Sequence, residues 1–130
     1  MSSLPLRQET IQIFGREMNQ PRLSCWIGDP GASYTYSGRT FAPASWVPEL
    51  AILRDQLREA LGRDFNSVLC NLYRDGSDSM GWHADNEPEL GLNPCIASVS
   101  LGGTRRFVLR HKKRRAPAVE LPLSNGSLLV

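Results

Sequence analysis

The feature that most constrains the fold is a change of periodicity at Gly62. Before it, apolar residues recur at helical spacing from about Val47 to Leu61, and a glycine is a common C-terminal stop for a helix. After it, the apolar runs are short and β-prone, and turn-rich segments separate them. The β-prone runs are Ser67–Tyr73, Ile96–Leu101, Phe107–His111 and Ser127–Val130, and an earlier one is Tyr34–Tyr36. One helix followed by several short strands predicts an α+β fold or a β-sandwich that carries a helix.

Composition limits the chain to one domain of ordinary size. It has 130 residues, of which 41% are hydrophobic, enough for one packed core. No apolar run approaches the roughly 20 residues that span a bilayer, and the first residues lack a secretory-signal pattern. Cys25, Cys70 and Cys95 form no Cys-x-x-Cys pair, so reduced structural thiols are favoured over zinc ligands or disulfides. We therefore expect a cytoplasmic protein without membrane contact.

The net charge of +2 is unevenly distributed. Residues 105–115 carry seven Lys or Arg and no acidic residue, while the rest of the chain has eight basic and thirteen acidic residues. A local basic stripe of this kind is typical of a surface that contacts nucleic-acid phosphates. A solvated hairpin gives the same pattern, and charge alone does not separate the two interpretations.

A His-x-Asp pair, His83 and Asp85, supplies two of the three ligands of a facial triad for non-haem Fe(II). In an extended segment, residues i and i+2 point to the same side, so both side chains can face one cavity. A pair this short also occurs by chance in surface loops. Upstream, Asn71 and Tyr73 have the same spacing, and an amide and a phenol can hydrogen-bond a small dicarboxylate. The alternative is a strand whose polar side meets solvent.

The segment from Asn71 to Glu87 closely resembles the AlkB family of Fe(II)/2-oxoglutarate-dependent nucleic-acid dealkylases. Further stretches resemble the same family in the same order, so that the resemblance covers the chain from about residue 10 to 130. These stretches are Pro21–Trp26 with Gly28-Asp29, Tyr34–Gly38, Ile96–Gly102 and Arg105–Lys112. The resemblance implies a double-stranded β-helix, or jelly-roll, dioxygenase core with an N-terminal α/β extension. Residues of about 1–66 would form a substrate-lid and helix region, and residues of about 67–130 a partial jelly-roll core of the same single domain.

The resemblance also implies a reaction. Fe(II) is the metal, 2-oxoglutarate is the cosubstrate, and molecular oxygen oxidises an N-alkyl group on a flipped base, which is restored as formaldehyde leaves. The implied partner is alkylated DNA, with RNA as a second candidate, and the full-length protein would be a monomer that is nuclear or nucleoid-associated in a DNA-repair context.

The implied roles are assigned by position in the family's pattern. His83 and Asp85 match iron ligands, and Asn71 and Tyr73 match positions that bind 2-oxoglutarate. The lesion pocket would comprise Tyr34, Tyr36, Ser37 and Glu87, with Tyr36 stacking on the base. The nucleic-acid backbone would be contacted by Arg105, Arg110, Lys112 and Lys113.

The family's third iron ligand has no match in this sequence. The family pattern continues with a Trp-x-His segment and an Arg-x-Asn-x-Thr-x-Arg segment, neither of which occurs before Val130. The only other histidine, His111, matches a family position that is not a ligand. We therefore expect a C-terminally incomplete chain that lacks the last strands and is inactive or impaired as it stands. A non-catalytic nucleic-acid-binding remnant of the family is the alternative.

Overall fold

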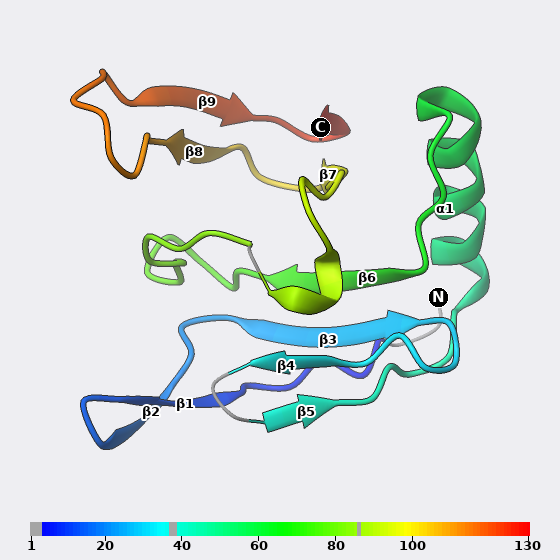
Figure 1. Ribbon diagram of the computed structural model, residues 1–130, viewed down its shortest axis with the longest axis horizontal. Coiled ribbons are helices and arrows are strands. Elements are labelled where there is room, and N and C mark those ends of the chain that lie inside the picture. Colours follow the sequence, from blue (N-terminus) through cyan, green and yellow to red (C-terminus); the bar gives the residue numbers. More distant parts are fainter. Residues whose placement is uncertain (1–3, 37–38, 86) are drawn as a thin grey trace. The chain divides into compact units, whose positions relative to one another are not determined.

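The computed structural model describes residues 4–36, 39–85 and 87–130. The chain divides into two compact units, Met1–Pro94 and Cys95–Val130 (Figure 1). The described residues form one α-helix, a short 3-10 helix and many short antiparallel strands, as the α+β prediction requires. None of the described helices is long and apolar enough to cross a membrane. The expected subdivision near residue 66 stays a prediction.

The first unit is built around the strand β3 (Leu23–Gly28). It pairs antiparallel with β6 (Ser67–Leu72) along its full length, in a register that sets Leu23 opposite Leu72 and Gly28 opposite Ser67 (Figure 1). Its other edge carries two isolated bridges, from Arg7 to Ser24 and from Ile27 to Ala44. At Gly28 an added Cβ would lie 2.8 Å from the carbonyl oxygen of Asn66, so only glycine allows this close approach of the strands.

Two hairpins complete the strands of this unit. The strands β1 (Thr10–Ile13) and β2 (Arg16–Asn19) pair antiparallel. They are joined by Phe14 and Gly15, whose positive φ angles of 49° and 75° are those of a two-residue type I′ turn. The strands β4 (Tyr34–Tyr36) and β5 (Arg39–Phe41) form the second hairpin, and β4 confirms the β-prone run expected there.

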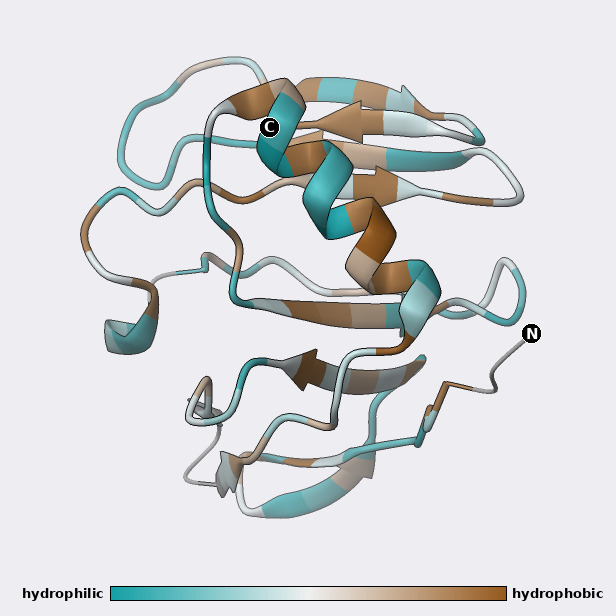
Figure 2. Ribbon diagram, turned by 90° about the vertical axis from the view of Figure 1, so that its right-hand side faces the viewer, coloured by the Kyte–Doolittle hydropathy of each residue, from teal (hydrophilic) through white to brown (hydrophobic). Residues whose placement is uncertain are grey.

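The helix α1 (Pro48–Leu61) confirms the helical periodicity almost to the residue. It begins with Pro48 at its first position and ends at Gly62, which takes the left-handed conformation at φ 61° and donates its amide to the Arg58 carbonyl. The apolar residues that recur along α1 are half-buried, and no residue of the helix is fully buried. Figure 2 shows apolar and hydrophilic residues alternating along it. The described residues therefore cover the apolar side of α1 only in part.

Polar contacts fasten the start of α1 to the turn that follows β3. Asp29 accepts a hydrogen bond of 2.7 Å from the Trp46 indole, and the Arg54 guanidinium lies 4.7 Å from the centre of the Trp46 ring. Arg54 and Asp29 also form an ion pair at 3.9 Å. Since β3 ends at Gly28, these contacts hold the helix at one end of the β3–β6 ladder.

The second unit contains two antiparallel pairs. The strand β7 (Ser98–Ser100) pairs with β10 (Ser127–Leu129), and β8 (Arg105–Leu109) pairs with β9 (Val119–Leu123). The amide of Gly102 donates to the Asn125 side chain at 2.9 Å, which links the turns after β7 and before β10. A strand was expected over Phe107–His111, but β8 begins and ends two residues earlier. Its pairing with β9 sets these bounds, and Arg110 and His111 belong to the following loop.

Candidate functional site

The strand β6 carries the first residue of the expected cosubstrate pair. Asn71 lies opposite Ser24 across the ladder, is exposed, and shares a face with Leu69. Cys70 and Leu72 point to the other face. Tyr73 directly follows the last residue of β6 and is half-buried. β6 therefore places Asn71 and Tyr73 at the beginning of the loop that leads toward His83.

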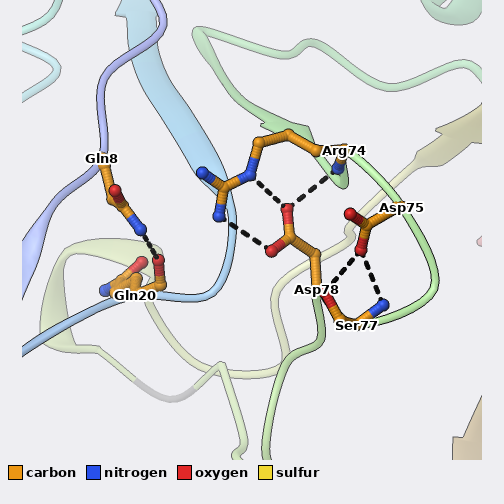
Figure 3. A network of polar contacts seen from close by, with 6 residues as sticks. All are labelled: Gln8, Gln20, Arg74, Asp75, Ser77 and Asp78. Carbon is orange, nitrogen blue, oxygen red and sulfur yellow. Dashed lines mark hydrogen bonds and ion pairs between the residues drawn. The ribbon is translucent and has the colours of Figure 1, made fainter.

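An ion pair between the buried Asp78 carboxylate and the more exposed Arg74 shapes this loop (Figure 3). The Asp78 carboxylate is only 4% exposed and accepts hydrogen bonds from the backbone amide, Nε and Nη2 of Arg74, at 2.9, 2.8 and 2.9 Å. The hydrogen bonds to Asp78 raise the pKa of the Arg74 guanidinium. The amide of Ser79 donates to the Pro21 carbonyl at 3.0 Å, which ties the loop to the segment that precedes β3. The loop between Asn71 and His83 is therefore held in shape by the Arg74–Asp78 pair and attached to the segment that precedes β3.

A second carboxylate stabilises the tip of the same turn (Figure 3). Asp75 accepts the backbone amide of Ser77 at 2.8 Å and also its hydroxyl. The Ser77 hydroxyl and amide lower the pKa of the Asp75 carboxyl. This is an Asx turn, in which an aspartate side chain satisfies the amide two residues later.

The structure brings the two expected iron ligands together. His83 Nε2 lies 3.4 Å from Asp85 Oδ1, and each side chain is about half exposed, at 47% and 48%. His83 Nδ1 lies 2.9 Å from the carbonyl oxygen of Gly81. A carbonyl only accepts hydrogen bonds, so Nδ1 carries a proton and Nε2 is the atom that faces the carboxylate.

This geometry fits two ligands of a divalent cation. Two adjacent ligands with bonds of about 2.1 Å to an octahedral ion lie roughly 3 Å apart, close to the separation of His83 Nε2 and Asp85 Oδ1. With the imidazole proton on Nδ1, Nε2 presents its lone pair beside the Asp85 carboxylate oxygen, as two ligands of one cation would. The hydrogen bond from Nδ1 to a backbone carbonyl is the usual means of orienting a ligating imidazole.

The described part of the chain supplies no third ligand. It contains no group of three or more His, Cys, Asp or Glu side chains placed to hold a metal ion. His111 lies in the second unit, after β8, where its Nδ1 accepts the amides of Lys113 and Arg114 at 3.0 and 2.9 Å. That nitrogen is therefore already occupied by the loop. The residues present fit Fe(II) as two of its three protein ligands.

The expected lesion pocket is described in part. Tyr34 and Tyr36 belong to β4, and Ser37 lies outside the described residues. Glu87 is half-buried and directly precedes the 3-10 helix η1 (Pro88–Leu90).

A carboxylate that sequence reasoning missed connects η1 to β4. Glu89 in η1 accepts the backbone amide of Thr35 at 3.0 Å. Hydrogen bonds from its own amide and from Thr35 lower the pKa of Glu89. The segment that contains Glu87 is thereby held beside the strand that carries the two tyrosines. Glu89 has no sequence signal, because its partner lies 54 positions away.

The basic residues divide between a strand and a loop. Arg105 is the half-buried first residue of β8, while Arg110, Lys112 and Lys113 are exposed in the loop between β8 and β9. Arg106, also in β8, pairs with Glu120 of β9 at 3.4 Å. The exposed positive charge is therefore concentrated after the strand and not along it.

Comparison with known proteins decides the family. The model of the 2OG-Fe(II) oxygenase superfamily matches residues 1–130. The DNA oxidative demethylase ALKBH2 of Homo sapiens is 45% identical over 127 residues, which are 92% of this chain and 49% of that protein. The chain belongs to the AlkB family of 2OG-Fe(II) oxygenases.

Two further AlkB relatives agree. The alpha-ketoglutarate-dependent dioxygenase alkB homolog 3 of Bos taurus is 45% identical over 136 residues, covering 98% of this chain and 47% of that protein. The DNA oxidative demethylase ALKBH2 of Arabidopsis thaliana is 42% identical over 114 residues, covering 85% of this chain and 36% of that protein. The chain thus spans about half the length, or less, of the curated relatives it matches. Membership in this family implies Fe(II) and 2-oxoglutarate as metal and cosubstrate.

Proposed function

We propose that this chain carries part of an oxygenase that removes alkyl groups from the nitrogen atoms of DNA bases. The observation that carries the proposal is the convergence of His83 Nε2 and Asp85 Oδ1 at 3.4 Å, with the imidazole oriented by the Gly81 carbonyl. The relatives named DNA oxidative demethylase support DNA as the substrate. RNA is the alternative nucleic acid.

Each expected residue has a role that its chemistry can perform. His83 and Asp85 hold Fe(II), which, when bound, activates molecular oxygen together with 2-oxoglutarate. The Asn71 amide and the Tyr73 hydroxyl bind and orient the 2-oxoglutarate carboxylates at the end of β6.

The substrate is held by a pocket and a charged loop. Tyr36 stacks on the flipped base, and Tyr34, Ser37 and Glu87 line the same pocket. The positive charge of Arg110, Lys112 and Lys113, with Arg105 at the start of β8, attracts the phosphate backbone. Binding should therefore weaken as the salt concentration rises.

The proposed fold is a jelly-roll dioxygenase core that begins at about residue 67, with residues of about 1–66 forming the substrate lid and helix. The antiparallel pairs β7–β10 and β8–β9 are compatible with such a core, and β6, at its beginning, pairs with β3 of the preceding region. We expect the protein to act as a monomer.

Residues 1–130 by themselves should bind iron weakly and turn over slowly or not at all, because the described residues provide two protein ligands and not three. The second candidate function, a nucleic-acid-binding remnant without catalysis, is favoured by the same observation. Reading the encoding DNA past codon 130 in all frames separates the two. A Trp-x-His followed by Arg-x-Asn-x-Thr-x-Arg supports an enzyme, and a genuine stop supports the remnant.

The proposed function is tested on the protein expressed from its complete reading frame. An oligonucleotide that contains 1-methyladenine or 3-methylcytosine should lose its methyl group as formaldehyde, in a reaction that requires Fe(II) and 2-oxoglutarate. Tyr36→Ala should greatly reduce this turnover with metal binding unchanged, whereas His83→Ala should abolish metal binding. Turnover by His83→Ala at the unaltered rate would remove this residue from the metal site.

A further inference from the structure

Two cysteines that are 45 positions apart in the sequence are direct partners across the β3–β6 ladder. Cys25 lies opposite Cys70 in the register, so their side chains project from the same face. Cys25 is 8% exposed and Cys70 is half-buried. Both are free thiols, and each affects the pKa of the other.

The backbone hydrogen bonds on the edge of β3 that faces away from β6 show which kind of antiparallel pair Cys25 and Cys70 form. The amide and carbonyl of Ser24 bond to Arg7, and the Trp26 carbonyl and Gly28 amide bond to Ala44, so these three residues direct their backbone groups away from β6. Cys25, which lies between them, directs its amide and carbonyl toward β6. Cys25 and Cys70 are therefore a hydrogen-bonded pair of an antiparallel ladder, whose Cα atoms lie about 5.5 Å apart.

That separation is within the range that a disulfide requires, about 4.4–6.8 Å between Cα atoms. The two Cβ atoms project to the same side and, in a hydrogen-bonded pair, lie about 5.5 Å apart, so a disulfide with its Cβ separation of about 3.5–4.5 Å has to draw the two strands together by roughly 1 Å. Cys95 is different, because it is exposed and is the first residue of the second unit.

We propose that Cys25 and Cys70 are a redox modification site, at which a low-molecular-weight disulfide such as glutathione disulfide converts the two thiols into a cross-strand disulfide. Cys70, the more accessible of the two, loses its proton to the solvent and attacks the small disulfide as a thiolate, forming a mixed disulfide and releasing one glutathione thiolate; because burial raises the pKa of this thiol, the step is faster in alkaline buffer. The Cys25 thiolate then attacks Sγ of Cys70 and releases the second. Two electrons pass from the protein to glutathione disulfide, and the two protons of the cysteines end on two glutathione thiols.

The consequence is mechanical, and it does not depend on the reaction proposed above. The bond would join β3 to β6 beside Asn71 and close the long chain segment between the two strands. Such a crosslink lowers the conformational entropy of the unfolded chain. The oxidised chain should therefore melt at a temperature on the order of 10 °C above that of the reduced chain.

The test equilibrates the folded, reduced chain with buffers of reduced and oxidised glutathione, quenches it with acid, and maps the disulfides by mass spectrometry. We expect a peptide pair linked through Cys25 and Cys70 to exceed the glutathione adducts at these positions by roughly tenfold or more, because closure is intramolecular. Cys95 should carry glutathione, and Cys95→Ser should leave the linked pair unchanged.

Matched variants make the result unambiguous. Cys70→Ser, at the half-buried position, should abolish the linked pair and the rise in melting temperature under the same buffers, without a change at the more buried Cys25. The proposal is overturned if Cys25 and Cys70 stay as thiols in excess glutathione disulfide, if they carry glutathione separately, or if the linked chain melts at or below the temperature of the reduced chain.

Discussion

Replacing Asp78 with alanine should be one of the most destabilising single changes in the loop between β6 and His83. The carboxylate is 4% exposed and accepts three hydrogen bonds from Arg74, two of them from the guanidinium. Breaking a fully buried ion pair costs about 3–5 kcal/mol, but here the Arg74 side chain is 45% exposed and remains partly hydrated without its partner. We therefore expect Asp78→Ala to lower the free energy of unfolding by about 2–3 kcal/mol.

Urea unfolding followed by circular dichroism measures this decrease, as a lower midpoint with an unchanged slope. Asp75→Ala is the matched control, because it removes a nearby carboxylate that is exposed and accepts its hydrogen bonds from Ser77 within the same turn. Native-state hydrogen exchange should show faster exchange at Ser79, whose amide bonds to Pro21, in Asp78→Ala alone. If the two variants are destabilised equally, the carboxylate of Asp78 does not hold the loop.

Three more predictions each rest on a single feature of the chain. Burial raises the pKa of Cys70 from 9.0 to about 12, so the unfolded thiol ionises first and the free energy of unfolding should fall as the pH rises above 9, by on the order of 1 kcal/mol at pH 10; urea titrations of Cys70→Ser should lack this fall, whatever the stability of the variant at neutral pH. Gly62→Ala forces a side chain into a left-handed backbone and should cost about 1 kcal/mol in the same assay, whereas Ala60→Ser on the exposed side of α1 should cost only about 0.5 kcal/mol, from its lower helix propensity. Replacing Lys112 and Lys113 with alanine should reduce the salt dependence of DNA binding, by about one unit of log–log slope for each phosphate that is no longer neutralised, and an unchanged slope in fluorescence anisotropy would exclude them from the interface.

The local elements were predictable where one segment determines its own structure. The helix was found because Pro48, the apolar stripe and Gly62 all lie within it or at its end. The strand β4 was found from its own β-prone residues. By contrast, β9 was missed, because Glu120 and Pro122 interrupt its apolar run and its pairing with β8 is what makes it a strand.

In the candidate site, too, only the features that lie within one short segment could be predicted from the sequence. The His83–Asp85 pair is local, and the two-residue spacing was enough to predict that the side chains converge. The burial of Asp78, the contact of Glu89 with Thr35 and the pairing of Cys25 with Cys70 could not be predicted. Each depends on a register or a contact between segments that are far apart in the sequence. The two cysteines in particular carry no sequence pattern that relates them, because only the ladder sets them opposite each other.

The most direct test of the account is whether His83 and Asp85 bind a metal ion together. Mn²⁺ takes nitrogen and oxygen ligands and broadens nearby nuclear magnetic resonances, so it reports even weak binding. Added in small amounts to the isotopically labelled chain, it should first broaden the resonances of residues 81–85, and His83→Ala and Asp85→Asn should each remove this effect. Broadening that begins elsewhere, or that survives both substitutions, would contradict the claim that this pair is part of an iron site.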